Sequence, residues 1–458
     1  MKQDLGSFRD RSGYVYSDPI SIIRTIMPCY KETWQLVKRS GLLDEVVNEK
    51  LLIPFEECPP IAGSWKSLNV NRIPFISYPY EWSFSQLQDA ALLTLKLQLK
   101  ALSKGLTLKD ASAYNIQFIG EHPVFIDILS FEEWEEGQPW EAYGQFCSHF
   151  LAPLALAAKK DLRLSQLSRQ WIDGIPLDIA SSMLPWKSKL SLGTYMHLVL
   201  HANMQKKYED PRSVKKNNTR SMSLEKLRSI IESLESTTKK FVFPRQDTEW
   251  GDYYNDTNYT DEGTSAKLKI VEEIAANFPG NLAVDLGANT GRFSLPLANY
   301  FDQVISADMD PAAVEFNYRH LSKNGPHNIL PVILDLSSPS PSLGWASQER
   351  KSFVDRCEAD MLLALALCHH LFFSSGIPFK QIAMFFASLL NPQGTLVCEF
   401  IPKKDSQVQR LLSARDDVFD DYTEENFRQD FNAAGFTEVK TFDMPDSVRT
   451  IYLFKKSN

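Results

Sequence analysis

Short apolar runs alternate with segments of helical spacing over the second half of the chain, from residue 267 onward. Apolar runs of this length, bounded by turn residues, are typical of buried strands, whereas apolar residues three and four apart indicate helices. Strands are expected at residues 282–286, 303–308, 329–334, 361–368, 395–400, 436–442 and 449–454. Strands that alternate with helices predict an α/β domain with a largely parallel sheet.

The first half of the chain has a mixed pattern and predicts a separate α+β domain. Helical spacing is found at residues 21–43, 87–102, 143–158 and 190–200, and a polar, charge-dense stretch at 205–220 is typical of a linker. We therefore expect an N-terminal domain at 1–205, a linker at 206–259 and a C-terminal domain at 260–458. The linker ends in an aromatic segment whose residues are candidates for a lid over a ligand: Trp250, Tyr253, Tyr254 and Tyr259.

Composition narrows the partners and the compartment. The net charge of −8 and the pI near 5.6 argue against non-specific binding to nucleic acid. The six cysteines form no C-x-x-C pair, so neither a metal site nor a disulfide framework is expected. The chain also begins without the apolar core of a signal peptide, and no apolar run approaches the roughly 20 residues that span a bilayer. We expect a cytoplasmic protein with no membrane partner; its oligomeric state cannot be read from the sequence.

A glycine-rich turn follows the first strand of the C-terminal domain. Asp285 ends this strand, and Gly287, Ala288, Asn289 and Gly291 form the turn before a helical segment. Glycines allow positive φ angles and a close approach of backbone to ligand. The stretch resembles the first motif of the class I methyltransferases that use S-adenosyl-L-methionine (SAM). That resemblance implies a Rossmann-like sheet with a terminal antiparallel pair of strands, and it places these five residues around the amino-acid and ribose end of SAM.

Acidic residues also end the next two expected strands. Asp308 ends the second strand and is followed by Met309, and Asp335 follows the third strand and precedes Leu336. Carboxylates at the ends of parallel strands line the ligand crevice of an open sheet. The resemblance implies that Asp308 binds the ribose hydroxyls and that the other three residues surround the adenine. A dinucleotide-dependent oxidoreductase is the competing interpretation, but Asn289 stands where its fingerprint needs glycine.

His369 and His370 follow the fourth expected strand, on the side where acceptor-binding residues of class I methyltransferases lie. Oxygen and nitrogen acceptors often need a base, and the pKa of histidine suits this role. At most one of the two side chains is expected to face the acceptor, because adjacent side chains point in different directions. A purely structural role for both stays open, and Glu399 is a further candidate base.

Part of the first half, at about residues 75–160, resembles the protein-kinase-like fold. Asp110, Asn115 and Asp127 match the spacing of the catalytic Asp and the two metal ligands of that fold. The His-Arg and Phe-Gly pairs of the kinase motifs are missing beside Asp110 and Asp127. The resemblance therefore implies a degenerate domain that holds a ligand. Helix caps and turns are the alternative use of these residues.

The combined patterns favour a SAM-dependent methyltransferase that acts on a small molecule or a pathway intermediate, in nodulation or in specialised metabolism. The N-terminal domain would shape access for the acceptor. More closely, residues 365–371 and 78–82 are similar to a bacterial methyltransferase family that includes rhizobial host-specific nodulation proteins. The alternative is a regulatory protein with a pseudokinase-like domain and a non-catalytic SAM domain.

Overall fold

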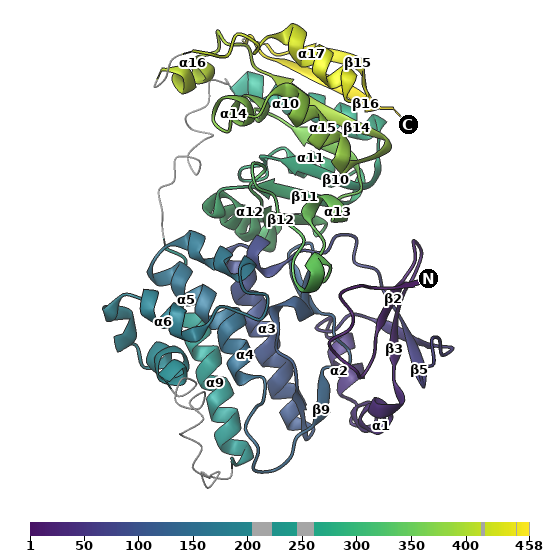
Figure 1. Cartoon of the computed structure of the whole chain (residues 1–458), viewed down its shortest axis with the longest axis vertical. Coiled ribbons are helices and arrows are strands. Elements are labelled where there is room, and N and C mark those ends of the chain that lie inside the picture. The colour runs from purple at the N-terminus through teal and green to yellow at the C-terminus, as the bar shows by residue number, and fades with distance from the viewer. Residues whose placement is uncertain (204–221, 245–260, 414–416, 446, 458) are drawn as a thin grey trace. The chain divides into compact units, whose positions relative to one another are not determined.

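The computed structural model describes residues 1–203, 222–244, 261–413, 417–445 and 447–457 (Figure 1). The chain forms two compact units. One comprises Met1–Arg245 with Leu343–Arg350, and the other comprises Gln246–Ser342 with Lys351–Asn458. The candidate lid residues Trp250, Tyr253, Tyr254 and Tyr259 lie outside the described residues. The domain limits expected from the sequence stay a prediction.

The first unit begins with an antiparallel sheet in the order β1-β2-β3-β5-β4. Its strands are β1 (Lys2–Gln3), β2 (Val15–Ser17), β3 (Ile22–Ile26), β4 (Phe55–Cys58) and β5 (Lys66–Val70), with helices α1 (Lys31–Arg39) and α2 (Leu42–Asn48) between β3 and β4. The helix expected over residues 21–43 is therefore wrong at its start. Ile22, Ile23, Thr25 and Ile26 are β-branched and favour the strand, where they pack on the pleated surface.

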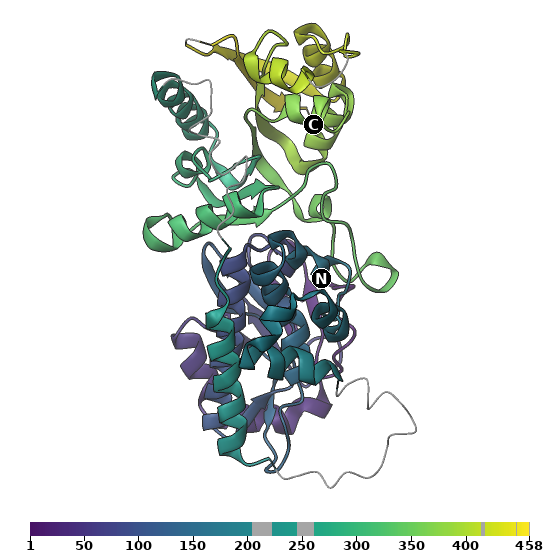
Figure 2. The same cartoon turned by 90° about the vertical axis from the view of Figure 1, so that its left-hand side faces the viewer.

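The long helix α3 (Phe84–Ser103) anchors the rest of the first unit. Ser83 and Gln86 form a capping box at its start, and Gly105 follows its end with φ of 72°. Helix α9 (Leu224–Lys240) runs alongside α3 (Figure 2), and Gln88 donates hydrogen bonds to the carbonyls of Thr238 and Phe241. The strands that follow α3 pair as β6 (Leu106–Leu108) with β9 (Phe131–Glu133) and β7 (Ile116–Ile119) with β8 (His122–Phe125). The other α-helices in the described part of this unit are α4 (Tyr143–Phe146), α5 (Ala152–Lys159), α6 (Leu177–Met183) and α7 (Leu192–Thr194).

Residues Leu343–Arg350 also belong to the first unit, although they lie between two strands of the second unit in the sequence. The carboxylate of Glu349 accepts hydrogen bonds from Nε and Nη2 of Arg9, at 2.9 and 2.8 Å. The guanidinium of Arg350 lies over the ring of Tyr114, 4.3 Å from its centroid. This segment is thus fixed by one ion pair and one cation–π contact.

The second unit contains a sheet in the order β12-β11-β10-β13-β14-β16-β15. Its strands are β10 (Gly280–Leu286), β11 (Phe301–Asp308), β12 (Ile329–Ile333), β13 (Ala359–Ala364), β14 (Leu390–Phe400), β15 (Phe436–Asp443) and β16 (Thr450–Lys456). The first five are parallel, and β16 is antiparallel to both β14 and β15. This order, with the last two strands paired at one edge (yellow in Figure 1), is the class I methyltransferase fold, which confirms the expected fold class.

Eight helices are described in the second unit, and several of them pack on its sheet. They are α10 (Asp261–Asn277), α11 (Ser294–Leu297), α12 (Pro311–Asn324), α13 (Phe353–Arg356), α14 (Cys368–Phe373), α15 (Phe379–Leu389), α16 (Ser406–Leu412) and α17 (Glu424–Ala433). Val271 and Ile274 on α10 pack in one buried cluster with Val304, Leu363 and Val397 from three strands. No helix within the described ranges has the length and apolar character needed to cross a membrane.

Candidate ligand site at the carboxyl ends of the parallel strands

The glycine turn between β10 and α11 has the left-handed backbone that its sequence requires. Gly287, Asn289 and Gly291 have φ angles of 74°, 52° and 81°. Asparagine tolerates this region better than most residues, so the missing middle glycine leaves the turn intact. The amides of Gly287 and Ala288 both donate to the carbonyl of Ala307 on β11, at 2.9 Å. The turn is therefore fixed to the neighbouring strand.

Asp285 is buried at the end of β10, with 2% of its surface exposed. Its carboxylate accepts a hydrogen bond from the hydroxyl of Ser294 at 2.7 Å, and Ser294 also contacts the hydroxyl of Ser306 at 2.9 Å. Asn317 donates to Ser306 at 2.8 Å. Burial raises the pKa of Asp285 to about 7, against the effect of the Ser294 hydrogen bond, which lowers it. Sequence reasoning found Asp285 but missed the three side chains that hold it.

Asp308 ends β11 and closes back on the glycine turn. Its carboxylate accepts hydrogen bonds from the amides of Asn289, at 2.7 Å, and Asp310, at 2.9 Å. Burial raises its pKa to about 6, although these amides favour the ionised form. Met309, the next residue, is 59% exposed. An exposed thioether beside a carboxylate gives one apolar and one polar group at the same strand end.

Asp335 follows β12 and is partly exposed, as is Leu336. One carboxylate oxygen of Asp335 accepts hydrogen bonds from the amide and the hydroxyl of Ser337, at 2.8 and 2.6 Å. The amide of Leu334 donates to the carbonyl of Asp308, so the ends of β11 and β12 are aligned. The structure thus brings the three acids expected from the sequence to the carboxyl ends of three adjacent strands, beside the switch point between β10 and β13.

The two adjacent histidines lie at the start of α14, directly after β13, and have different surroundings. His369 is 1% exposed, and no described atom forms a hydrogen bond with its Nδ1. His370 is partly exposed, and the two ring centroids are 4.1 Å apart. Burial holds the pKa of His369 well below its ordinary value, and lowers that of His370 to about 4. Both rings are therefore neutral near pH 7, and Nδ1 of His369 has no hydrogen-bond partner among the described residues.

Sequence comparison places the chain among known proteins. No protein-family model matches it. It is 34% identical to nodulation protein NoeA of Rhizobium meliloti (strain 1021) over 462 residues, which cover 99% of this chain and 96% of the relative. The chain belongs to the NoeA family. This confirms the resemblance to rhizobial nodulation proteins that residues 365–371 and 78–82 indicated.

Solved structures similar to part of this chain include methyltransferases. N-methyltransferase NodS from Bradyrhizobium japonicum WM9 is 13% identical and has a TM-score of 0.33, with 43% of this chain and 98% of NodS covered. Magnesium protoporphyrin IX methyltransferase (ChlM) from Synechocystis PCC 6803, with bound SAH, is 18% identical and has a TM-score of 0.32, with 45% of this chain and 92% of ChlM covered.

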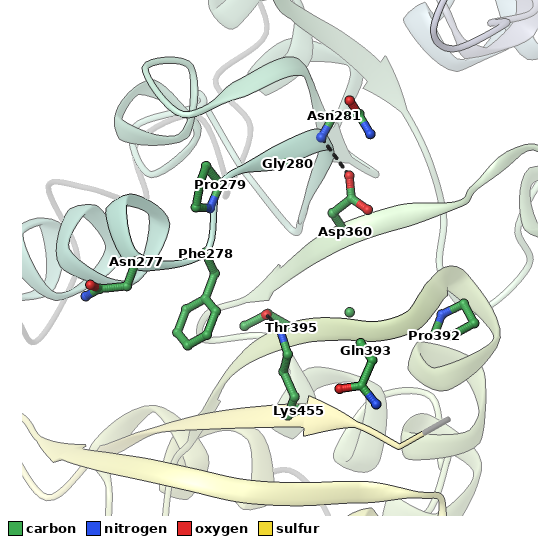
Figure 3. Close-up of a pocket in the computed structure, with 11 residues that line it drawn as sticks. Asn277, Phe278, Pro279, Gly280, Asn281, Asp360, Pro392, Gln393, Thr395 and Lys455 are labelled. Atoms are coloured by element: carbon green, nitrogen blue, oxygen red, sulfur yellow. Dashed lines mark hydrogen bonds between the residues drawn. The ribbon is translucent and has the colours of Figure 1, made fainter. Parts of the chain in front are cut away.

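A cavity of about 450 Å³ lies at the amino ends of the parallel strands, around the beginnings of β10 and β13 (Figure 3). Asp360, Lys455 and Phe278 line it, and the amide of Asn281 donates to Asp360 at 2.6 Å. The ammonium of Lys455 lies 4.6 Å from the ring centroid of Phe278 and bonds to Thr395. None of the expected site residues lines this cavity, so it is separate from the candidate site.

In the first unit Asp110 interacts with both other kinase-like motif residues, Asn115 and Asp127. Asp127 accepts a hydrogen bond from Arg24 at 2.8 Å and another from Ser130 at 2.6 Å, and Asp110 accepts one from the amide of Ser112 at 2.8 Å. Burial raises the pKa of Asp110. Because Arg24 already pairs with Asp127, and Asp110 holds its own turn, these contacts also fit the alternative of turns and caps. The kinase-like assignment stays a prediction.

Proposed function

We propose that the protein is a SAM-dependent methyltransferase whose acceptor is a small molecule. The observation that carries this proposal is the meeting of the left-handed glycine turn with the carboxylates of Asp285, Asp308 and Asp335 at the switch point of a class I methyltransferase sheet. The name of the NoeA relative supports a role of the product in nodulation.

The residues fit the donor in both space and charge. A Cβ at Gly291 would lie 2.4 Å from Asn317, so glycine keeps the turn close against α12, and Gly287 leaves its turn free of a side chain. Asp308 and Asp335 would hold the ribose and the adenine amine, with Met309 and Leu336 beside the ring. Asp285 contributes negative charge near the cationic end. The donor supplies an electrophilic methyl group on a sulfonium sulfur.

His369 is our proposed catalytic base, and its buried Nδ1, which no atom of the described residues satisfies, supports this choice over His370. It takes the proton that the acceptor hydroxyl or amine loses as the acceptor lone pair forms its bond to carbon. The carbon–sulfur bond electrons stay with the sulfur. Burial keeps His369 neutral, so the ring can accept a proton, and the same burial makes it a weaker base than a solvent-exposed histidine.

Calorimetry with SAM, its demethylated product SAH and ATP–Mg²⁺ tests the proposed function. We expect SAM and SAH to bind to the wild-type protein, and Asp308→Ala to weaken SAM binding about 100-fold, because charge-assisted hydrogen bonds to two hydroxyls are lost. Asp302→Ala, an exposed residue on the same strand, is the matched control and should bind like the wild type. Absence of SAM binding by the wild-type protein would refute the proposal, and binding of ATP–Mg²⁺ that Asp127→Ala abolishes would favour a phosphotransferase.

SAM affinity should rise about tenfold from pH 5.5 to pH 8, because Asp285, with a pKa of about 7, ionises in this range. The free protein has the opposite dependence. The folded-state pKa of Asp285 is raised, so its contribution to stability is present below pH 4 and is lost as the pH rises through about 7. Calorimetric titrations and thermal unfolding across this pH range measure both. In Asp285→Asn the rise in affinity above about pH 6.5 should disappear, and only the ionisation of Asp308, with a pKa of about 6, should remain; an unchanged slope above pH 6.5 would exclude Asp285 as its source.

Replacement of His369 with asparagine should lower methyl transfer at least about 100-fold while SAM affinity changes by less than about threefold. The measurement is transfer of labelled methyl groups from SAM into the small-molecule fraction of a rhizobial cell extract. His370→Asn is the control, and we expect it to keep most of the activity. Equal losses in the two variants would contradict the assignment of the base to His369.

A further inference from the structure

A buried ion pair links the first helix of the second unit to its fifth strand. The ammonium of Lys267 on α10 lies 2.6 Å from a carboxylate oxygen of Glu399, which is next to the end of β14. The side chains are 2% and 0% exposed. An ionised pair at this depth carries a large desolvation cost, so its contribution to stability alone is small.

The same oxygen of Glu399 also fixes the loop between β13 and α14. It accepts a hydrogen bond from the amide of Ala366 at 2.7 Å. Ala366 has a φ of 50°, a region that costs an L-residue about 1 kcal/mol or more unless its surroundings hold it there. Glu399 therefore compensates a strained backbone position with a charge-assisted hydrogen bond.

This loop forms one wall of the candidate SAM site. A Cβ built at Gly287 would lie 3.2 Å from Cδ1 of Leu367, so Leu367 packs against the glycine turn. The carbonyl of Leu367 also accepts hydrogen bonds from the amides of His370 and Leu371, which start α14. The conformation of the loop thus determines how Leu367 packs on the glycine turn and how the helix that carries His369 begins.

Glu399 accepts hydrogen bonds from the Lys267 ammonium and from the Ala366 amide. Burial lowers the pKa of Lys267, and the neighbouring carboxylate of Glu399 opposes this shift. A carboxylate bonded to an ammonium and to a backbone amide is a poor base, because a proton would have to displace both partners. The geometry therefore argues against the base role that the sequence left open for Glu399.

We propose that Glu399 and Lys267 are positioning residues that hold the loop 365–368 against the glycine turn and aim His369 at the acceptor. This inference rests on the proposed SAM-dependent function. The same arrangement is expected in the ligand-free protein, because the hydrogen bond from the Ala366 amide to Glu399 forms without any ligand.

Two uncharged double variants of similar shape test whether the hydrogen bond from the Ala366 amide to Glu399 holds the loop. Lys267→Met/Glu399→Gln removes both charges but keeps an amide oxygen for Ala366, and Lys267→Met/Glu399→Met removes that oxygen as well. We expect the Gln variant to bind SAM within about threefold of the wild type and the Met variant to bind about tenfold more weakly. Without SAM, the Ala366 amide should exchange at least about tenfold faster in the Met variant than in the Gln variant.

Hydrogen exchange by NMR and SAM calorimetry measure these differences, and thermal unfolding shows that both variants are folded. If the Met variant does not fold, Lys267→Met/Glu399→Leu takes its place. Equal exchange and equal SAM affinity in the matched pair would overturn the inference. If the wild-type protein fails to bind SAM, the proposed function fails by itself, and the exchange rates still decide whether Glu399 holds the loop.

Discussion

Replacement of Gly291 with alanine is expected to abolish measurable SAM binding and to lower the free energy of unfolding by about 3 kcal/mol. Gly291 has a φ of 81°, and a Cβ there would lie 2.4 Å from Nδ2 and 2.5 Å from Oδ1 of Asn317. Asn317 would have to move, and it donates to Ser306, which is bonded to Ser294 beside Asp285. One methyl group would therefore disturb both the glycine turn and the carboxylate behind it.

Gly435→Ala is the matched control for this variant. Gly435 follows α17 in the same unit and has a similar φ of 92°, but no described atom lies within 4 Å of the position of its Cβ. In the control the free energy of unfolding should fall by only about 1 kcal/mol, the cost of a left-handed backbone for alanine, and SAM should bind as in the wild type. Chemical denaturation and calorimetry measure both properties. Similar losses in the two variants would mean that the left-handed conformation, and not the contact with Asn317, limits the turn.

The fold of the second unit was predictable because its sequence pattern is local. Each buried parallel strand is a short apolar run, and three of the five runs have Asp285, Asp308 or Asp335 at or just after their ends. Proximity of the three acids follows from sheet topology, since the carboxyl ends of neighbouring parallel strands share one edge. The terminal antiparallel pair was also found, with limits within two residues of β15 and β16.

Prediction failed where two periodicities overlap. Residues 22, 23 and 26 fit helical spacing, but they form β3, because β-branched side chains and pairing with β2 and β5 favour the strand. Non-local contacts were missed for another reason. Lys267 and Glu399 are 132 residues apart, and no spacing rule joins them. One signal was present: Lys267 lies one and two turns before Val271 and Ile274, so a lone lysine occupies an apolar helix face.

Arg449 and Asp405 form a second buried pair of this kind, and its disruption has the other large expected effect. Two nitrogens of Arg449 donate to the two oxygens of Asp405 at 2.8 and 3.0 Å, and the side chains are 2% and 6% exposed. Asp405 also caps α16, where it accepts a hydrogen bond from the amide of Gln407. Arg449→Met should lower the free energy of unfolding by about 3–5 kcal/mol, because it leaves a buried carboxylate without its cation.

The exposed pair of Arg428 with Glu438 in the same unit provides the contrast. These side chains are 52% and 30% exposed at a distance of 3.0 Å, and Arg428→Met should cost less than about 1 kcal/mol because water screens the charges. Urea denaturation of both variants gives the comparison. The double variant Arg449→Met/Asp405→Asn should recover most of the loss, since no charge remains unpaired and the asparagine still caps α16. If the double variant is as unstable as Arg449→Met, the packing of the arginine side chain, and not the stranded carboxylate, accounts for the loss.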